Sequence, residues 1–214
     1  MDNPTICYKT YLKNKYVSLC NPCLPRISVK KALLNRKSYR VFSQTPLSVQ
    51  DVSTILYYGL GINPSFHDFK HRFYPSAGGK FPLEGYFFAL KTHIACGIYH
   101  YNVQRHGLEQ LSSFSSFNLS EYFPQFIIKK PTGLIVLTGM LQRTMEKYGE
   151  RGRRYIDMEA GHVGQNIQLV CTALNIHTVP IGGGYYLKKI ESILDINSKS
   201  EPVIYVLALG YDAK

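Results

Sequence analysis

The stretch from Arg153 to Leu174 constrains the fold of this chain more than any other, because its apolar residues recur at helical spacing. They stand four, three, four, three and four positions apart, at Ile156, Ala160, Val163, Ile167, Val170 and Leu174. This spacing places all of them on one face of an α-helix, so we predict the longest helix of the chain here. The apolar stripe has to be buried, either in the core of the same chain or against a second copy.

The rest of the chain mixes shorter helices and strands without strict alternation. Periodicity and turn residues predict further helices at 28–35, 48–58 and 187–194, and strands at 84–90, 98–101, 108–111, 134–138 and 203–209. Ser48 and Asp51 form a capping pair that starts the second helix, and Gly59 and Gly61 are expected to end it. This order predicts an α+β fold with one mixed sheet flanked by helices.

With 214 residues, the chain fits one domain. Residues 1–27 contain Pro4, Pro22 and Pro25 and are predicted to form an irregular N-terminal arm, followed by a folded domain over 28–214. No apolar run reaches the roughly 18 residues that a membrane span requires, so no membrane partner is expected. The first residues do not resemble a secretion signal, so we expect a cytoplasmic location.

The formal net charge of +11 would suit a nucleic acid, an anionic cofactor or an acidic partner. Apart from Arg151, Arg153 and Arg154, the basic residues are spread along the chain, and no RNA-recognition or zinc-finger motif accompanies them. We therefore expect a scattered basic surface and no nucleic-acid partner.

Five cysteines without a secretion signal argue against disulfides. Cys20 and Cys23 form a CxxC pair, but no second ligand pair or strand–helix context supports a zinc or redox site. An N-terminal turn, with no metal, is the expectation.

Two glycine-containing segments suggest places where the main chain approaches a flat ligand. Pro75-Ser76-Ala77-Gly78-Gly79 is a turn sequence whose glycines adopt positive φ without steric cost. Pro180-Ile181-Gly182-Gly183-Gly184 has three successive glycines, which favours close approach to another group; a flexible loop is the alternative. Neither segment has the GxGxxG pattern of a Rossmann site.

Arg36, Ser38 and Arg40 stand at alternate positions just after the first predicted helix. Two guanidiniums and a hydroxyl suit a phosphate through charge-assisted hydrogen bonds, whereas the alternative is a solvated basic turn. Together with the glycine segments, the triplet suggests a site for a flat cofactor that carries a phosphate.

Lys147 and Tyr148 precede the long helix and lie close in sequence to the three arginines named above. A lysine or tyrosine acts as a general base only when its pKa lies well below about 10, a direction that neighbouring positive charge favours. A plain basic loop is the alternative. On the long helix itself, Glu159, His162 and Asn166 form a polar line that lacks the further ligands of a metal site, so we expect a buried polar seam or a hydrogen-bond network between helices.

Taken in order, these segments resemble the nitroreductase superfamily of FMN flavoproteins, and most closely its SagB-type branch. That branch comprises the azoline dehydrogenases, which oxidise thiazolines and oxazolines in ribosomal peptides. The matching pieces run over about residues 30–211 and are Arg36-x-Ser38-x-Arg40, Pro46-Leu-Ser48, Tyr58-Gly59-Leu-Gly61, Arg72-x-Tyr74-Pro75-Ser76-Ala-Gly78-Gly79, Tyr99-His100-Tyr101, Lys147-Tyr148-Gly149-x-Arg151, Arg154-Tyr155, Glu159-Ala-Gly161-His162, Gln165-Asn166, Gly182-Gly183 and Leu209-Gly210. Each piece is short, but the ordered set is specific to the branch.

The resemblance implies a nitroreductase-like fold that binds FMN at a homodimer interface, with the long helix at that interface. It assigns the phosphate and ribityl end to Arg36, Ser38 and Arg40. It assigns the isoalloxazine ring to Pro75, Ser76, Ala77 and Gly78, contributed by the second subunit. The main chain that reaches the reactive ring nitrogen would come from Pro180, Ile181, Gly182 and Gly183. The matching motif at Gln165 and Asn166 is assigned to the cofactor site as well, and Lys147 and Tyr148 match the catalytic pair of the branch.

The chain departs from the family pattern at two places. Asn175 stands where the family usually has glycine, and asparagine tolerates the left-handed backbone that glycine would provide. Lys214 is the only basic residue after the last predicted strand that could take the place of the basic residues with which relatives approach the phosphate.

Three functional hypotheses follow. The first is an FMN-dependent dehydrogenase of peptide azolines, working with a cyclodehydratase that makes the azolines in a precursor peptide. The second is a nitroreductase or flavin reductase that acts on small molecules with NADH or NADPH. The third is a basic module that binds flavin or nucleic acid without catalysis. The Lys147–Tyr148 pair favours the first.

Overall fold

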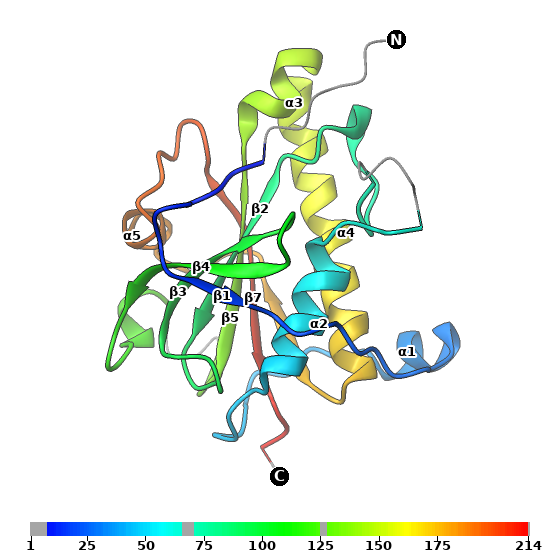
Figure 1. The fold of residues 1–214 in the computed structure, drawn as a ribbon, viewed down its shortest axis with the longest axis vertical. Coiled ribbons are helices and arrows are strands. Elements are labelled where there is room, and N and C mark those ends of the chain that lie inside the picture. Colours follow the sequence, from blue (N-terminus) through cyan, green and yellow to red (C-terminus); the bar gives the residue numbers. More distant parts are fainter. Residues whose placement is uncertain (1–7, 66–70, 125–127, 214) are drawn as a thin grey trace.

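The computed structural model describes residues 8–65, 71–124 and 128–213 (Figure 1). Its centre is a seven-stranded sheet with the strand order β1-β4-β3-β2-β5-β7-β6. The strands are β1 Tyr16–Ser18, β2 Leu83–Ala89, β3 Gly97–Asn102, β4 Gly107–Ser113, β5 Gly133–Gly139, β6 His177–Ile181 and β7 Val203–Gly210. The α-helices of the described residues are α1 Val29–Asn35, α2 Val49–Leu60, α3 Leu141–Tyr148, α4 Arg151–Ala173 and α5 Leu187–Ile193.

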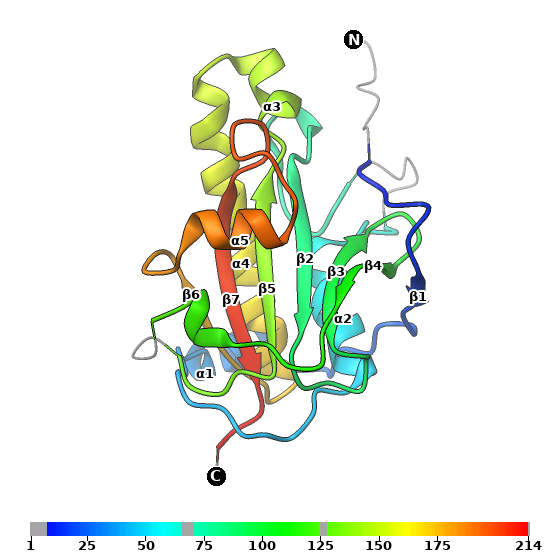
Figure 2. The same ribbon diagram turned by 90° about the vertical axis from the view of Figure 1, so that its left-hand side faces the viewer.

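Helices cover both faces of the sheet. Figure 2 shows α5 in front of the sheet, and α4 and α2 behind it. The side chains of the central strands alternate between these two layers, as the pleat of a strand requires. On β2, Phe87 packs on the α2–α4 side, whereas Tyr86 and Phe88 pack on the α5 side. The α+β class predicted from the sequence is confirmed, but the sheet is more uniform than expected. Each pair of neighbouring strands is antiparallel, and parallel pairing among the described residues is confined to isolated bridges.

The helix boundaries follow local chemistry that the sequence shows. Ser48 accepts a hydrogen bond from the Asp51 N–H at 3.0 Å and so caps α2. The helix continues through Gly59, so the prediction that this glycine ends it is wrong; the C-cap is Gly61. Asn175 has φ of 56°, the left-handed conformation that we expected asparagine to provide after α4.

The apolar stripe of α4 belongs to the core of its own chain. Ile156, Val163 and Ile167 are fully buried, in one cluster with residues of α2 and the sheet. This decides between the two possibilities that the sequence left open. It also removes the stripe as an argument for a dimer, because all of its residues except the partly buried Leu174 are already buried in the core.

Two strands and one α-helix of the described residues were not predicted. β1 lies within the arm that we expected to be irregular, and it pairs with β4 at the edge of the sheet. α3 occupies the segment that we treated as a loop, and β6 occupies the link before the glycines. β6 contains Pro180, which is tolerated because β7 is the only strand beside this edge strand, and the one bridge on its other side is at Thr178 and not at Pro180.

A charged triad is buried between β2, β3 and β4. The His100 Nε2 lies 2.9 Å from a Glu84 oxygen, and its Nδ1 lies 2.9 Å from a Glu109 oxygen. Arg143 Nη1 lies 2.6 Å from the other Glu84 oxygen. Burial alone would lower the pKa of His100, but its hydrogen bonds to Glu109 and Glu84 outweigh burial and raise this pKa. The two carboxylates therefore favour the charged form of the imidazole inside the sheet.

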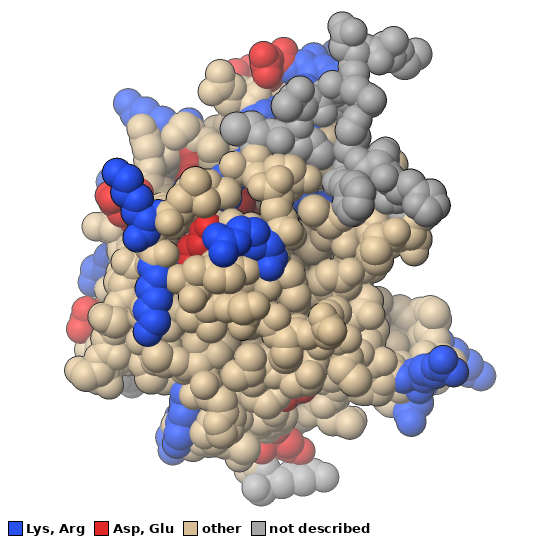
Figure 3. All heavy atoms as spheres, in the orientation of Figure 1, with Lys and Arg blue, Asp and Glu red and all other residues tan. Residues whose placement is uncertain are grey.

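The surface agrees with the expectation of scattered charge. On the face shown in Figure 3, Lys and Arg side chains lie at several separate places and do not merge into one patch. Within the described part of the chain, no helix has the length and apolar character needed to cross a bilayer. Cys20, Cys23, Cys96 and Cys171 are free thiols, and Cys7 lies outside the described residues.

Candidate functional site

The Pro-Ser-Ala-Gly-Gly segment forms a tight turn that contains the short 3-10 helix Ala77–Gly79. Gly78 and Gly79 have φ of 63° and 65°, which explains why glycines stand there. Ser76 closes the turn, because its hydroxyl accepts a hydrogen bond from the Phe81 N–H at 2.8 Å.

The end of α3 brings Lys147 and Tyr148 to this turn. A Cβ placed on Gly78 would lie 2.6 Å from the Tyr148 hydroxyl and 3.1 Å from Lys147 Nζ. Gly149, with φ of 57°, ends the helix directly after them. The two predicted motifs are therefore neighbours within one chain, although about 70 residues separate them in sequence. The glycine hydrogen leaves room for the two side-chain ends.

Two side chains of α4 form hydrogen bonds to the main chain of the turn and of the residues just before it. Glu159 Oε1 accepts a hydrogen bond from the Ala77 N–H at 2.9 Å, and Asn166 Nδ2 donates to the Phe73 carbonyl at 3.0 Å. The predicted polar line on α4 thus joins the helix to a turn, and the prediction of a network between helices is wrong. His162 of this line is exposed, and it lines a recess beside the turn.

Glu159 is buried, and burial raises its pKa to about 7 against the opposing effects of the Ala77 N–H, the Ser76 hydroxyl and the Arg72 charge. Arg72 is the nearby buried cation, and its guanidinium packs over the rings of Tyr74 and Phe81. A carboxyl with this pKa exists in both protonation states near neutral pH.

The Arg36–Arg40 segment lies at the other end of α4, beside the edge strand β6. Ser38 forms a parallel bridge with Thr178, and the Tyr39 N–H donates to the Thr178 carbonyl at 3.1 Å. Arg36 reaches inward to α4, where its Nη1 donates to Gln168 Oε1 at 3.3 Å. Arg40 stays exposed.

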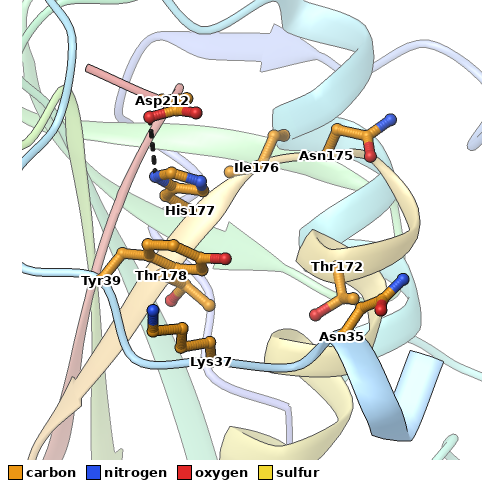
Figure 4. Close-up of a pocket in the computed structure, with 9 residues that line it drawn as sticks. All are labelled: Asn35, Lys37, Tyr39, Thr172, Asn175, Ile176, His177, Thr178 and Asp212. Atoms are coloured by element: carbon orange, nitrogen blue, oxygen red, sulfur yellow. Dashed lines mark ion pairs between the residues drawn. The ribbon is translucent and has the colours of Figure 1, made fainter. Parts of the chain in front are cut away.

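Two recesses flank this segment. The first, of about 300 Å³, is shown in Figure 4, where the Tyr39 and His177 rings stack and Lys37 lies beside them. The His177 Nδ1 lies 3.8 Å from an Asp212 carboxylate oxygen, and these two side chains form one wall of the recess. The second, of about 680 Å³, is bordered by Ser38 and Arg40. Ser38 and Arg40 of the predicted phosphate residues thus border open space, whereas Arg36 is half-buried against α4 and lines neither recess. Lys214 lies outside the described residues.

The second glycine segment continues from β6. Pro180 and Ile181 are in the strand, and Gly182 and Gly183 follow it exposed. No described atom lies within 4 Å of a Cβ placed on Gly183. The main chain is therefore accessible here, at the opposite end of β6 from the bridge between Ser38 and Thr178.

Within one chain, the predicted site residues form two separate groups. Gln168, which binds Arg36, and Glu159, which binds Ala77, are about 14 Å apart along the α4 axis. Figure 1 shows α1 and α3 beside opposite ends of α4. The triplet and β6 form one group; the turn, Lys147, Tyr148 and Asn166 form the other. Gln165 is exposed on α4 between them.

The sequence did not predict the contacts that two residues make at the site. Nothing in the local sequence shows that Gln168 meets Arg36, since 132 positions separate them. Glu159 was noticed within the polar line, but its partner 82 positions earlier was not predictable from spacing.

Comparison with known proteins identifies the family. The sequence profile of the nitroreductase family matches residues 33–211. The chain belongs to the nitroreductase family. A relative from Methanocaldococcus jannaschii, named as a nitroreductase, is 33% identical over 179 residues, which are 82% of this chain and 88% of the relative. This nitroreductase-family chain is accordingly an oxidoreductase, of a family that generally uses flavin.

Solved structures share the fold. A nitroreductase of Ralstonia eutropha superposes with a TM-score of 0.80 at 21% identity, over 100% of this chain and 97% of that one. A chain of the Escherichia coli microcin synthetase McbBCD complex, solved with truncated pro-MccB17 bound, gives 0.68 at 20% identity over 95% and 80%. A nitroreductase of Desulfovibrio desulfuricans, solved with FMN, gives 0.59 at 16% identity over 88% of each chain.

The residues present suit a flavin mononucleotide. Ser38 and Arg40 offer a hydroxyl and a guanidinium at an open recess, which is a donor set for phosphate. Gly183 leaves its main chain open to a neighbouring group. Both observations meet the needs of a ligand with an anionic end and a flat end.

Proposed function

We propose that this protein is an FMN-dependent dehydrogenase that converts thiazoline or oxazoline rings of a ribosomally made peptide to thiazoles or oxazoles. The observation that carries the proposal is the position of Lys147 and Tyr148 at Gly78 of the turn. Two side chains that can accept a proton stand where the resemblance expects the flat ring of the cofactor. FMN, when bound, would supply the hydride acceptor.

The chemistry explains why a base is needed beside the turn. Aromatising an azoline removes one hydride and one proton from neighbouring ring carbons and leaves a double bond between them. Lys147 and Tyr148 would hold or take up the proton, since both end in groups that accept one when deprotonated. Lys147 is exposed and Tyr148 is half-buried, so a peptide could reach them from solvent.

The likeness to a chain of the McbBCD synthetase supports this choice of substrate class, because that complex was solved with a truncated pro-peptide bound. We accordingly propose a cyclodehydratase and a precursor peptide as partners. The cyclodehydratase would form the azoline that this protein oxidises.

The test is a single turnover without oxygen. Purified protein loaded with oxidised FMN is mixed with a peptide that carries a preformed thiazoline, and the flavin absorbance and peptide mass are followed. We expect bleaching of the flavin together with the loss of two hydrogen masses from the peptide. A matched peptide that already carries the thiazole is the control and should leave the absorbance unchanged. Unchanged absorbance and mass with the thiazoline peptide would count against the proposal.

A second candidate function is a nitroreductase or flavin reductase that uses NADH or NADPH. The name of the Methanocaldococcus jannaschii relative favours it. The same loaded protein is offered NADH or NADPH and a nitroaromatic compound. Rapid turnover there, combined with inertness toward the thiazoline peptide, would replace the first proposal by the second.

Arg36→Ala is expected to weaken FMN binding by about 1.5–3 kcal/mol, the range for a hydrogen bond to a charged group, since Arg36 is half-buried. The dissociation constant is measured by quenching of flavin fluorescence, and the released flavin is identified by chromatography. Lys30→Ala, an exposed cation on α1, is the matched control and should change the affinity little. Equal affinities of the Arg36→Ala variant and the parent would remove Arg36 from the cofactor site.

We further propose a symmetric homodimer. The turn and the triplet lie at opposite ends of α4, so two antiparallel copies of α4 would bring the turn of one chain toward the triplet of the other. The outward side of α4 carries the exposed Met158. It also carries Gly161, where no described atom lies within 4 Å of an added Cβ. Light scattering should give twice 24.4 kDa. A monomer that carries a full complement of FMN would refute the dimer.

A further inference from the structure

The glycine turn and α3 leave the sheet side by side. β2 and β5 are antiparallel neighbours, with Leu83 opposite Gly139 (Figure 2). The turn precedes β2 and α3 follows β5, so both segments lie at the same end of the sheet. The Met140 N–H donates to the Pro82 carbonyl at 2.9 Å and joins them where they leave it. This main-chain bond stands before the first residue of α3, so it does not set the rotation of the helix about its own axis.

Arg143 of α3 supplies a second link between the two segments. Its Nη1 lies 2.6 Å from Glu84 Oε1 of β2 and donates to the Phe81 carbonyl at 3.2 Å. A guanidinium Nη carries two hydrogens, so one nitrogen can serve both partners. Only 13% of the Arg143 side chain and 3% of the Glu84 side chain are exposed, so water screens this ion pair little. Arg143 thus ties α3 to the sheet and to the end of the turn at once.

Phe81 is held in a backbone conformation that few residues with a side chain adopt, with φ of 45°. Its N–H donates to the Ser76 hydroxyl at 2.8 Å, and its carbonyl accepts from Arg143. Such a conformation persists only where the surroundings hold it firmly. The two bonds therefore fix the end of the turn relative to its beginning and relative to α3.

Helix geometry carries this constraint from Arg143 to Lys147. Residues four positions apart lie on one face of a helix, about 6 Å apart along its axis. At the C-terminal end of that face, Lys147 and the adjacent Tyr148 meet Gly78, three residues before Phe81. α3 therefore touches the turn segment at two points. One contact alone would let the helix rotate about it, whereas two contacts fix the orientation.

We propose that Arg143 is a positioning residue for the oxidation: through its two partners it fixes the rotation of α3 and so holds Lys147 and Tyr148 at the turn. The inference deepens the proposed function and rests on it for the chemistry. The placement of the pair, however, can be tested without any substrate.

The first arm of the test measures that placement by NMR in the protein as purified. Labels on glycine and on the tyrosine rings reveal a nuclear Overhauser effect (NOE) between Gly78 and Tyr148, assigned from its loss in Gly78→Ala and in Tyr148→Phe. Arg143→Met keeps the helix propensity but removes the donors, and it should abolish this NOE. Arg143→Lys retains a charged donor and should restore it. Arg26→Met, the same change at an exposed arginine, is the control and should leave it unchanged.

A purely structural role for Arg143 would lower stability and leave the pair in place in the folded molecules. An NOE of parental intensity in Arg143→Met would therefore overturn the proposal, as would its absence from the parent.

A second variant guards against unfolding, because Arg143→Met removes one partner of a buried ion pair. Glu84→Gln, Arg143→Met removes one charge of each sign and leaves His100 paired with Glu109. The same loss of the NOE is expected, and parental intensity in this variant would count equally against the proposal.

The second arm measures oxidation of the thiazoline peptide. A displacement of about 1 Å in a reacting group slows catalysis by roughly 100-fold, so kcat of Arg143→Met should fall by about 10- to 100-fold with KM nearly unchanged. Added to Lys147→Ala, Tyr148→Phe, the same change should cost less than about twofold more, because it acts only through that pair.

Multiplied losses would show that Arg143 acts independently of the pair and would overturn the proposal. Parental kcat in a variant that has lost the NOE would do the same. If the parent itself does not oxidise azolines, the proposed function fails, and the NMR arm still decides whether Arg143 positions the pair.

Discussion

The double variant Lys147→Ala, Tyr148→Phe is expected to bind FMN as the parent does and to oxidise a thiazoline peptide at least about 100-fold more slowly, the usual scale for loss of a general base. The loss should fall on kcat and leave the apparent peptide affinity nearly unchanged, since a base acts mainly in the transition state. Gln142→Ala, an exposed position one turn earlier on α3, is the control for effects on the helix. Parental turnover by the double variant would remove both residues from the chemistry.

Two glycine substitutions test the position of Lys147 and Tyr148 at the turn without changing either of these side chains. Gly78→Ala would place a methyl group 2.6 Å from the Tyr148 hydroxyl and should displace both side-chain ends. Gly79→Ala has nearly the same positive φ, but no described atom lies within 4 Å of its Cβ. Each variant should lose about 1–2 kcal/mol of stability from the left-handed backbone. Only Gly78→Ala should also slow oxidation, and equal rates for the two variants would argue against a role for the contact at Gly78.

His100→Ala is expected to lower the free energy of unfolding by about 3–5 kcal/mol, because it leaves the carboxylates of Glu84 and Glu109 buried without the cation between them. Urea denaturation near pH 6 measures this loss. The matched control is His93→Ala, an exposed histidine, which should change stability by less than about 0.5 kcal/mol. A loss no larger than that of the control would show that the triad does not stabilise the fold.

The triad also predicts how stability depends on pH. The pKa of His100 is raised above 6.5, so its contribution is complete below pH 6.5 and is lost as pH rises through the folded pKa. Burial opposes ionisation of Glu84 and Glu109, but bonds to His100 and other partners lower the pKa of both below 4.5. Their contribution is present above pH 4.5 and is lost as pH falls through the folded values. The full contribution therefore lies between pH 4.5 and 6.5, and His100→Ala should flatten the alkaline decline.

Much of the secondary structure was predictable, because the relevant interactions join residues within about four positions of each other. The stripe of α4 and the cap at Ser48 are of this kind. So is the left-handed backbone at Asn175, which depends on one residue type. α3 was missed because Met140 provides no side-chain cap, and β6 because Pro180 weighs against a strand.

The sequence by itself determined the main helices, the glycine turn and the set of residue types that resembles the nitroreductase family. Only the tertiary structure decided that the apolar stripe of α4 is part of the core. The same holds for the position of Lys147 and Tyr148 beside Gly78, and for the hydrogen bond that Glu159 accepts from the Ala77 N–H. These are contacts between positions far apart in the chain, 82 in the case of Ala77 and Glu159. The physical reason is that local propensity fixes the shape of each element, whereas the side chains that meet depend on how the elements pack around a shared core.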